Sequence, residues 1–185
     1  CIHTEKGSFS VLIPIPGHHM VYNALAGTAV GLTYGLNLEE IKAGIESLQP
    51  VSGRFHIIDT GKYTVVDDCY NANPVSMKAS LDVLTDALGR KVAILGDMGE
   101  LGKEEVEMHR EVGVYAASKN LDLLICVGEL SQYMAEAARH AAPTKNILHF
   151  KTKEELLQEL RGVLQEGDTV LVKASHFMKF EDVVQ

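Results

Sequence analysis

Between residues 54 and 173 the chain alternates short apolar runs with longer amphipathic runs. The apolar runs have the length of buried strands and occupy residues 54–59, 63–67, 91–95, 121–127, 147–150 and 169–173. The runs between them have a helical period and occupy residues 76–88, 104–118, 130–140 and 153–164. This alternation predicts an α/β domain with a Rossmann-like, mostly parallel sheet and helices on both faces. The first two strands are expected to form a hairpin-like pair.

The residues before this domain follow another pattern. Helices are expected at 17–31 and 38–48, with Asn37 as the N-cap of the second. The apolar face of the first is expected to carry Val21, Leu25, Thr28 and Ala29. Residues 11–14 are expected to be the last strand of a β-rich segment, and residues 50–53 to be a domain boundary. Because the chain opens on such a segment without an initiator Met, we expect a fragment of a longer protein.

Composition excludes several classes of function. The formal net charge is −8 and the cationic residues do not cluster, which disfavours nucleic-acid binding. No apolar run approaches the roughly 18 residues of a membrane span, and no signal-peptide pattern is present. The three cysteines, Cys1, Cys69 and Cys126, lack metal-ligand spacing and predict free thiols in a reducing compartment. We therefore expect a cytoplasmic protein, and we expect it to be a monomer.

Polar clusters follow three of the predicted strands, at residues 67–74, 96–102 and 173–179. Because ligands bind at the carboxyl ends of strands in open α/β sheets, we expect the three clusters to meet at one edge. A ligand site is one interpretation. Helix caps and turns are the other, since Asn and Asp favour both.

Three features could be taken for a phosphate loop, a catalytic histidine and a metal site, but their sequence context argues against each. Residues 96–102 lack the G-x-x-x-x-G-K-[ST] spacing of a phosphate loop, and that spacing occurs nowhere in the chain. His109 lies among charged residues of a predicted helix and is expected at the surface. The adjacent pair His18 and His19 would chelate one metal ion poorly, because neighbouring helical side chains diverge. We therefore assign no metal ligands.

The order of the motifs resembles the Mur ligases, the ATP-dependent amino-acid-adding enzymes of peptidoglycan assembly. The matching segments are GHHMVYNALA (17–26), SGR (52–54), DCYNANP (68–74), LGDMGELG (95–102), HREVG (109–113) and VLVKAS (170–175). Together they are most similar to the members that add D-alanyl-D-alanine to UDP-N-acetylmuramoyl-tripeptide. The resemblance covers essentially the whole chain.

The resemblance implies a three-domain enzyme, of which residues 1–51 are the tail of the central ATP-binding domain and residues 52–185 the carboxyl-terminal Rossmann-like domain. It implies ATP and Mg²⁺ as cofactors, with the P-loop and most magnesium ligands upstream of this chain. The acceptor's carboxylate would be phosphorylated, and the dipeptide's amine would attack the acyl phosphate. The fragment alone is expected to be inactive.

The resemblance also implies individual roles. Asn23 would contact the adenine, Arg54 an ATP phosphate, and Asp68 the ribose or a nearby part of the nucleotide. The residues expected to line the closed site are Asn71, Asn73 and Ser76, and those expected to meet the dipeptide are Lys173 and Ser175. No catalytic residue is assigned.

Three positions depart from the family's pattern, namely Met20, Ala174 and His176, where Asn, Gly and Arg are common. His176 would be a weaker, pH-dependent partner for an anion than Arg. Two alternatives remain: another Mur-type or folylpolyglutamate-synthase-like ligase, and a Rossmann-like binding module without catalysis.

Overall fold

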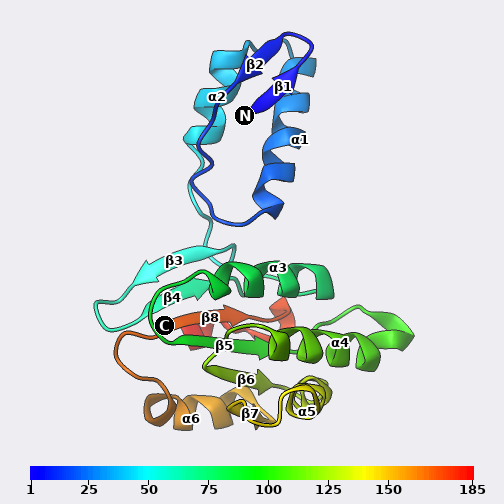
Figure 1. Ribbon diagram of the computed structural model, residues 1–185, viewed down its shortest axis with the longest axis vertical. Helices are drawn as coiled ribbons and strands as arrows, with labels where there is room; N and C mark the ends of the chain where they lie inside the picture. Colours follow the sequence, from blue (N-terminus) through cyan, green and yellow to red (C-terminus); the bar gives the residue numbers. More distant parts are fainter. The chain divides into compact units, whose positions relative to one another are not determined.

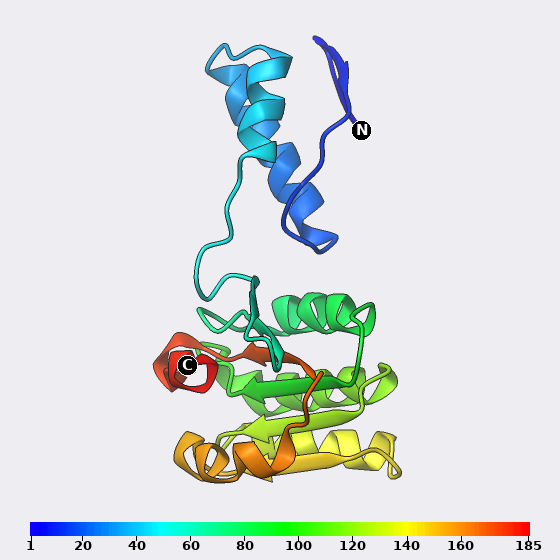
Figure 2. The same cartoon turned by 90° about the vertical axis from the view of Figure 1, so that its left-hand side faces the viewer.

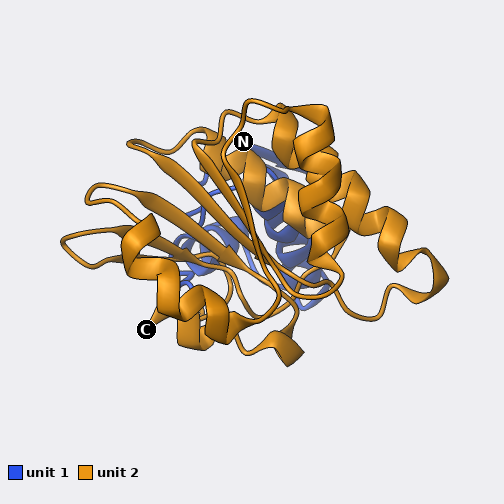
Figure 3. Ribbon diagram, turned by 90° about the horizontal axis from the view of Figure 1, so that it is seen from below, with its two compact units in different colours: residues 1–50 blue, residues 51–185 orange.

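A computed structural model describes residues 1–185 as two compact units, residues 1–50 and residues 51–185 (Figure 3). None of its helices combines the length and the hydropathy that a membrane-spanning helix requires.

The first unit contains a small hairpin and two helices (Figure 1). Strands β1 (Ile2–Thr4) and β2 (Gly7–Phe9) pair antiparallel, and helices α1 (His19–Thr33) and α2 (Leu38–Glu46) follow. Asn37 caps α2 as predicted, in a capping box with Glu40. The core of this unit consists of Ile2, Phe9, Ala24, Ile41 and Ile45.

Two expectations for this unit were wrong. Residues 11–14 form no strand. The buried face of α1 carries Ala24, Thr28 and Gly31, so only Thr28 of the four expected residues is confirmed, while Val21 and Leu25 are more than 40% exposed and Ala29 is exposed too. The reason is close packing: a Cβ at Gly31 would lie 2.9 Å from Cγ1 of Ile41, so α2 packs on the stripe of smallest side chains.

The second unit is built on a six-stranded sheet with the order β3-β4-β8-β5-β6-β7. The strands are β3 (His56–Asp59), β4 (Thr64–Asp67), β5 (Lys91–Gly96), β6 (Leu123–Val127), β7 (Ile147–Phe150) and β8 (Thr169–Lys173). Only the edge strand β3 is antiparallel to its neighbour, so the predicted hairpin and the mostly parallel sheet are both confirmed.

Helices cover both faces of this sheet (Figures 2 and 3). The helices are α3 (Pro74–Thr85), α4 (Glu105–Ser118), α5 (Ser131–Ala141), α6 (Lys153–Val163) and the short α7 (Glu181–Val184), with 3₁₀ turns η1 (Gly102–Glu104) and η2 (His176–Met178). Helices α3, α4 and α5 pack in a row on one face, and α6 and α7 cover the other. Right-handed crossovers explain this division, because the chain reverses its direction across the sheet between β7 and β8.

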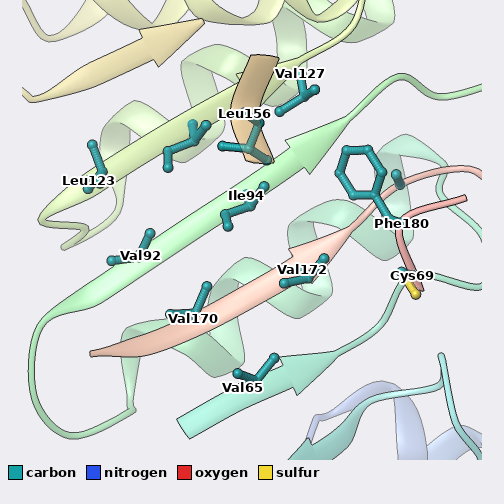
Figure 4. Close-up of a cluster of buried hydrophobic side chains, with 12 residues drawn as sticks. Val65, Cys69, Val92, Ile94, Leu123, Val127, Leu156, Val170, Val172 and Phe180 are labelled. Atoms are coloured by element: carbon teal, nitrogen blue, oxygen red, sulfur yellow. The ribbon is translucent and has the colours of Figure 1, made fainter. Parts of the chain in front are cut away.

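The central strands are buried on both faces, which is why they read as continuous apolar runs. In Figure 4, Val92 and Ile94 of β5 and Val170 and Val172 of β8 point to the same face, where Phe180 closes one end of the cluster. Helix α3 begins two residues earlier than predicted, at Pro74, and ends at Thr85. Leu88, the last residue of the predicted helix, therefore lies in the bend that follows α3 and is 88% exposed.

Candidate functional site

The three polar clusters meet at the carboxyl edge of the sheet, as predicted. Strand β8 lies between β4 and β5, so the segments that follow these strands are neighbours. The amide of Ser175 donates to the carbonyl of Asp97 at 3.1 Å, and its Oγ accepts from the amide of Gly99 at 2.8 Å. The same Oγ lies 3.4 Å from the carbonyl of Ala72 and donates to it. Ser175 thus joins all three loops and is only 5% exposed.

A buried ion pair connects the first and third clusters. Asp67 pairs with Val172 in the register of β4 and β8, so the next residues, Asp68 and Lys173, lie side by side. Lys173 Nζ is 2.7 Å from Oδ2 of Asp68, and it also donates to the carbonyl of Asn71 at 2.9 Å. The Lys173 side chain is 3% exposed and that of Asp68 is 14% exposed. The ammonium group is therefore directed into the protein.

The two adjacent carboxylates bind the turn that precedes β3. Asp68 Oδ1 accepts from the amide of Phe55 at 3.2 Å, and its Oδ2 accepts from Ser80 Oγ at 2.6 Å. Asp67 Oδ2 accepts from the amide of Gly53 at 2.7 Å and from Ser52 Oγ at 3.2 Å. All four carboxylate oxygens of this pair accept hydrogen bonds, because Asp67 Oδ1 accepts from the Cys69 thiol at 3.0 Å.

Arg54 is at the tip of that turn and is exposed. Its guanidinium carbon lies 4.1 Å from the centroid of the Tyr70 ring, a cation–π arrangement. His176, which follows β8, also lies against Tyr70, with 5.4 Å between the ring centroids, and His176 Nδ1 lies 3.5 Å from Oε1 of Glu181. A positively charged, outward-facing group at this edge suits an anionic ligand.

Asn73 and Ser76 form a capping box at the start of α3. Asn73 Oδ1 accepts from the amide of Ser76 at 2.8 Å, and Ser76 Oγ accepts from the amide of Asn73 at 3.1 Å. These hydrogen bonds, with Pro74 at the first helical turn, explain the end of the 67–74 loop as a helix start. Asn71 is exposed, and its Oδ1 accepts from the amide of Ala72.

The second loop is held by buried polar side chains. Asp97 Oδ1 accepts from the amide and hydroxyl of Ser131, at 2.6 and 2.7 Å, and so caps α5. A Cβ at Gly128 would lie 2.3 Å from the same oxygen, so only glycine fits beside this carboxylate. The loop therefore uses its acid internally.

His109 is fully buried, so the expectation of a surface histidine was wrong. Its Nε2 accepts from the amide of Met98 at 2.9 Å, and its Nδ1 lies 2.6 Å from the carbonyl of Glu105. These partners require a neutral ring with the proton on Nδ1. The charged neighbours that suggested exposure lie on the other side of α4, and the histidine anchors the 96–102 loop to that helix.

The thiols are free, as predicted, and two are buried. Burial and the neighbouring Asp67 carboxylate raise the pKa of Cys69. Burial raises the pKa of Cys126 to about 12. Neither thiol is a nucleophile at neutral pH.

Asn23 belongs to α1 of the first unit, where it is exposed and its Nδ2 lies 3.3 Å from the sulfur of Met20. No group of three or more His, Cys, Asp or Glu side chains within residues 1–185 is arranged to hold a metal ion. Sequence reasoning missed the roles of Asp67, Tyr70 and His109. For Asp67 the sequence did hold a signal, because this acid ends the apolar run that forms β4. It held none for Tyr70 or His109.

A family model described as Mur ligase, glutamate ligase domain, matches residues 53–176. Among curated proteins, the UDP-N-acetylmuramoyl-tripeptide--D-alanyl-D-alanine ligase of Bacillus subtilis (strain 168) is 36% identical over 177 residues, which are 94% of this chain and 38% of that protein. The chain thus spans about two fifths of the length of the curated relatives it matches.

Solved structures give the same result. A crystal structure of MurF from Acinetobacter baumannii has a TM-score of 0.89 and 35% identity, and the match covers 98% of this chain and 40% of that one. The structure of MurF ligase from Thermotoga maritima in complex with ADP has a TM-score of 0.76 and 28% identity, covering 92% of this chain and 38% of that one.

Proposed function

This chain belongs to the Mur ligase family, and we propose that it is part of the ligase that adds D-alanyl-D-alanine to UDP-N-acetylmuramoyl-tripeptide in peptidoglycan precursor synthesis. The observation that carries the proposal is the 36% identity to curated ligases of this specificity, which extends over 94% of the chain. We propose that residues 1–51 are the tail of the central domain and residues 52–185 the carboxyl-terminal domain. The division into compact units at residues 50 and 51 supports this assignment.

In the proposed reaction the tripeptide's terminal carboxylate takes the γ-phosphoryl group of ATP. The amine of D-Ala-D-Ala then attacks the acyl phosphate, and inorganic phosphate leaves the tetrahedral intermediate. Negative charge builds on the phosphoryl oxygens and on the former carbonyl oxygen, so fixed cationic donors lower the barrier. Arg54 is an exposed cation at the carboxyl edge of the sheet, and its planar guanidinium matches a phosphate group.

The contacts at this edge narrow the expected site residues. Arg54 and Asn71 are exposed, and the Asn71 side chain bonds only to the adjacent amide of Ala72, so we assign both to the ligands, with Asn23 of the first unit assigned to the adenine. Asn73 is exposed as well, but it forms the capping box of α3 with Ser76. The remaining expected residues, Asp68, Lys173 and Ser175, bind protein groups of other segments. We propose that these five hold the loops that present the site and that Asp68 also meets the nucleotide.

Magnesium would neutralise phosphate charge during the transfer. Three carboxylates at this edge, Asp67, Asp68 and Asp97, accept hydrogen bonds from the protein, and Glu100 is the exposed one. We propose that the ion is held mostly by the phosphates and by the central domain. We also propose that the enzyme is cytoplasmic and monomeric. Light scattering of the full-length protein would test whether it is a monomer.

The test is phosphate release by the full-length protein with ATP, Mg²⁺ and UDP-N-acetylmuramoyl-tripeptide, assayed against a panel of amines. D-Ala-D-Ala is expected to support turnover, and L-Ala, D-Glu and L-Glu are expected not to. Turnover with another amine alone would favour the second candidate, a Mur-type or folylpolyglutamate-synthase-like ligase. Absence of turnover with every amine would favour a binding module.

The isolated chain gives a second test of the same proposal. Because we place the phosphate cradle of the P-loop outside residues 1–185, we expect the chain alone to bind ATP weakly and to hydrolyse none. Isothermal titration calorimetry measures this directly. Micromolar or tighter binding of ATP by residues 1–185 would contradict the proposed division of the site.

A further inference from the structure

We infer that His176 binds the terminal carboxylate of D-Ala-D-Ala, beside the phosphoryl group that we assign to Arg54. The inference rests on the proposed function, because it takes the dipeptide as a substrate and Arg54 as the cation that meets a phosphate. It gives a task to the histidine that stands where arginine is common in the family.

The ring of Tyr70 holds two cationic side chains at this edge of the sheet. The guanidinium carbon of Arg54 lies 4.1 Å from the ring centroid. The His176 ring centroid lies 5.4 Å from it, with the two ring planes tilted by 36°. Tyr70 is itself fixed, because its amide donates to the carbonyl of Gly53 at 3.0 Å. The guanidinium and the imidazole are therefore separated by no more than the sum of the two centroid distances.

His176 has one ring nitrogen available to a ligand. Its Nδ1 lies 3.5 Å from Oε1 of Glu181, and its side chain is 70% exposed. Its Nε2 has no hydrogen-bond partner within residues 1–185. A protonated imidazole donates from both nitrogens, so Nε2 can donate a charge-assisted hydrogen bond to a carboxylate while Nδ1 faces Glu181.

The segment that carries His176 is anchored on both sides. Ser175, which precedes it, is 5% exposed and joins the three loops. Phe180, which follows it, is fully buried, and a Cβ at Gly96 would lie 2.7 Å from Cζ of its ring. Between them, the amide of Lys179 donates to the carbonyl of His176 at 3.0 Å. A side chain on a segment fixed in this way binds a ligand with little further cost of ordering.

The length of the dipeptide fits the spacing of the two cations. Two extended residues span about 7 Å at most. A carboxylate and a phosphoryl group each bind their cation at about 3 Å, which brings the two anions within reach of that length. With its carboxylate at His176, the dipeptide can therefore place its amine at the acyl phosphate held by Arg54. A group that fixes the carboxylate would thus orient the nucleophile as well as bind it.

The imidazole makes this contact depend on pH. The charged or titratable side chains around His176 are Glu181 and Tyr70, with Arg54 on the Tyr70 ring and Lys173 and Lys179 in the same segment. Of these residue types, only histidine ordinarily changes its charge between pH 5 and 8. Binding of the carboxylate is therefore expected to weaken as the pH rises and the imidazole loses its proton, whereas an arginine at this position would keep its charge.

The experiment pairs a change in the enzyme with a change in the substrate. Full-length wild type and His176→Gln are compared by kcat and KM for D-Ala-D-Ala and for its C-terminal amide, which lacks the negative charge. Because a charge-assisted hydrogen bond is lost, wild type is expected to prefer the dipeptide over the amide by about 10- to 100-fold in kcat/KM. His176→Gln should prefer it by less than about 3-fold, with an unchanged KM for ATP.

Two further variants complete the experiment. His140→Gln changes another exposed histidine, in the last turn of α5, and is the matched control, expected to stay within about 2-fold of wild type. His176→Arg is expected to match wild type at pH 6.5 within about 3-fold and to exceed its kcat/KM for D-Ala-D-Ala increasingly up to pH 8.5. Ionisation of the dipeptide's amine affects both enzymes equally and cancels in their ratio.

The outcomes separate this inference from the proposed function. Equal discrimination between dipeptide and amide by wild type and His176→Gln would overturn the inference in an active ligase. A constant ratio of His176→Arg to wild type across the pH range, or a change in KM for ATP in place of that for the dipeptide, would do the same. Absence of dipeptide addition by the wild type would overturn the proposed function and the inference with it.

Discussion

The thiols of Cys69 and Cys126 show how burial controls a residue's chemistry in this fold. Both are 1% exposed or less, whereas Cys1 is exposed. We expect one thiol per chain to react rapidly with Ellman's reagent at neutral pH and three after denaturation. Rapid reaction of more than one thiol in the native chain would contradict the packing of β6 and of the 67–74 loop.

The same burial predicts a pH dependence. A thiol whose folded pKa is raised adds stability that is fully present below the unfolded pKa of 9.0 and is lost as pH rises through the folded pKa, which is about 12 for Cys126. Between those values the free energy of unfolding should fall by about 1.4 kcal/mol per pH unit for this thiol. Urea denaturation from pH 9 to 11 measures the slope. Cys126→Ala should reduce it, and an equal slope in both proteins would contradict the account.

At the scale of elements, the crossing of α4 and α5 depends on one glycine. A Cβ at Gly113 would lie 2.1 Å from the carbonyl oxygen of Met134, so the helices approach to backbone contact. We expect Gly113→Ala to destabilise the chain by about 1–3 kcal/mol through overpacking, although alanine favours helix. Gly162→Ala on α6 is the matched control, because nothing lies within 4 Å of its Cβ. It should stabilise by a few tenths to about 1 kcal/mol. Chemical denaturation compares the two, and equal effects would contradict the packing.

Helix α3 tests whether the 67–74 loop ends in a cap or in a ligand contact. Asn73→Ala should cost about 0.5–2 kcal/mol of stability, whereas Asn73→Ser should cost little, because Ser is also a good N-cap. If Asn73 serves only as a cap, the full-length ligase with Asn73→Ser should keep its activity within about 3-fold. A normal melting temperature together with a much larger loss of turnover would instead make Asn73 a ligand residue.

At the scale of the whole molecule, hydrophobic periodicity was sufficient to predict the six strands of the sheet and its four longer helices, but the short α7 was not predicted. Strands β7 and β8 begin and end where they were expected, and the three polar clusters meet as proposed. Central strands of a parallel sheet are apolar on both faces, so their signal does not depend on which face is buried. In α1 the prediction did depend on which face is buried. Small or apolar residues occur on several faces of that helix, so the sequence did not show which one packs against α2.

The candidate site could be located from the sequence but its internal partners could not. A strand-end position marked Asp68 and Lys173 as neighbours of a ligand, yet only the register of β4 and β8 pairs them. His109 looked like a surface residue because sequence shows the charges around it along the chain and hides the loop that covers it. Hydrogen bonds between segments distant in sequence carry no local pattern that a single sequence reveals.

The central proposal is that this chain supplies Arg54 to the nucleotide site of a ligase that adds D-alanyl-D-alanine to UDP-N-acetylmuramoyl-tripeptide. Mass spectrometry of the UDP-linked product measures it most directly, with full-length wild type and Arg54→Ala incubated with ATP, UDP-N-acetylmuramoyl-tripeptide and D-Ala-D-Ala. We predict a wild-type product heavier than the tripeptide by the dipeptide less one water. We expect its rate of formation to fall about 100-fold or more in Arg54→Ala at an unchanged melting temperature, in line with the loss of one transition-state donor. Absence of that product, or equal rates for the two proteins, would contradict the account.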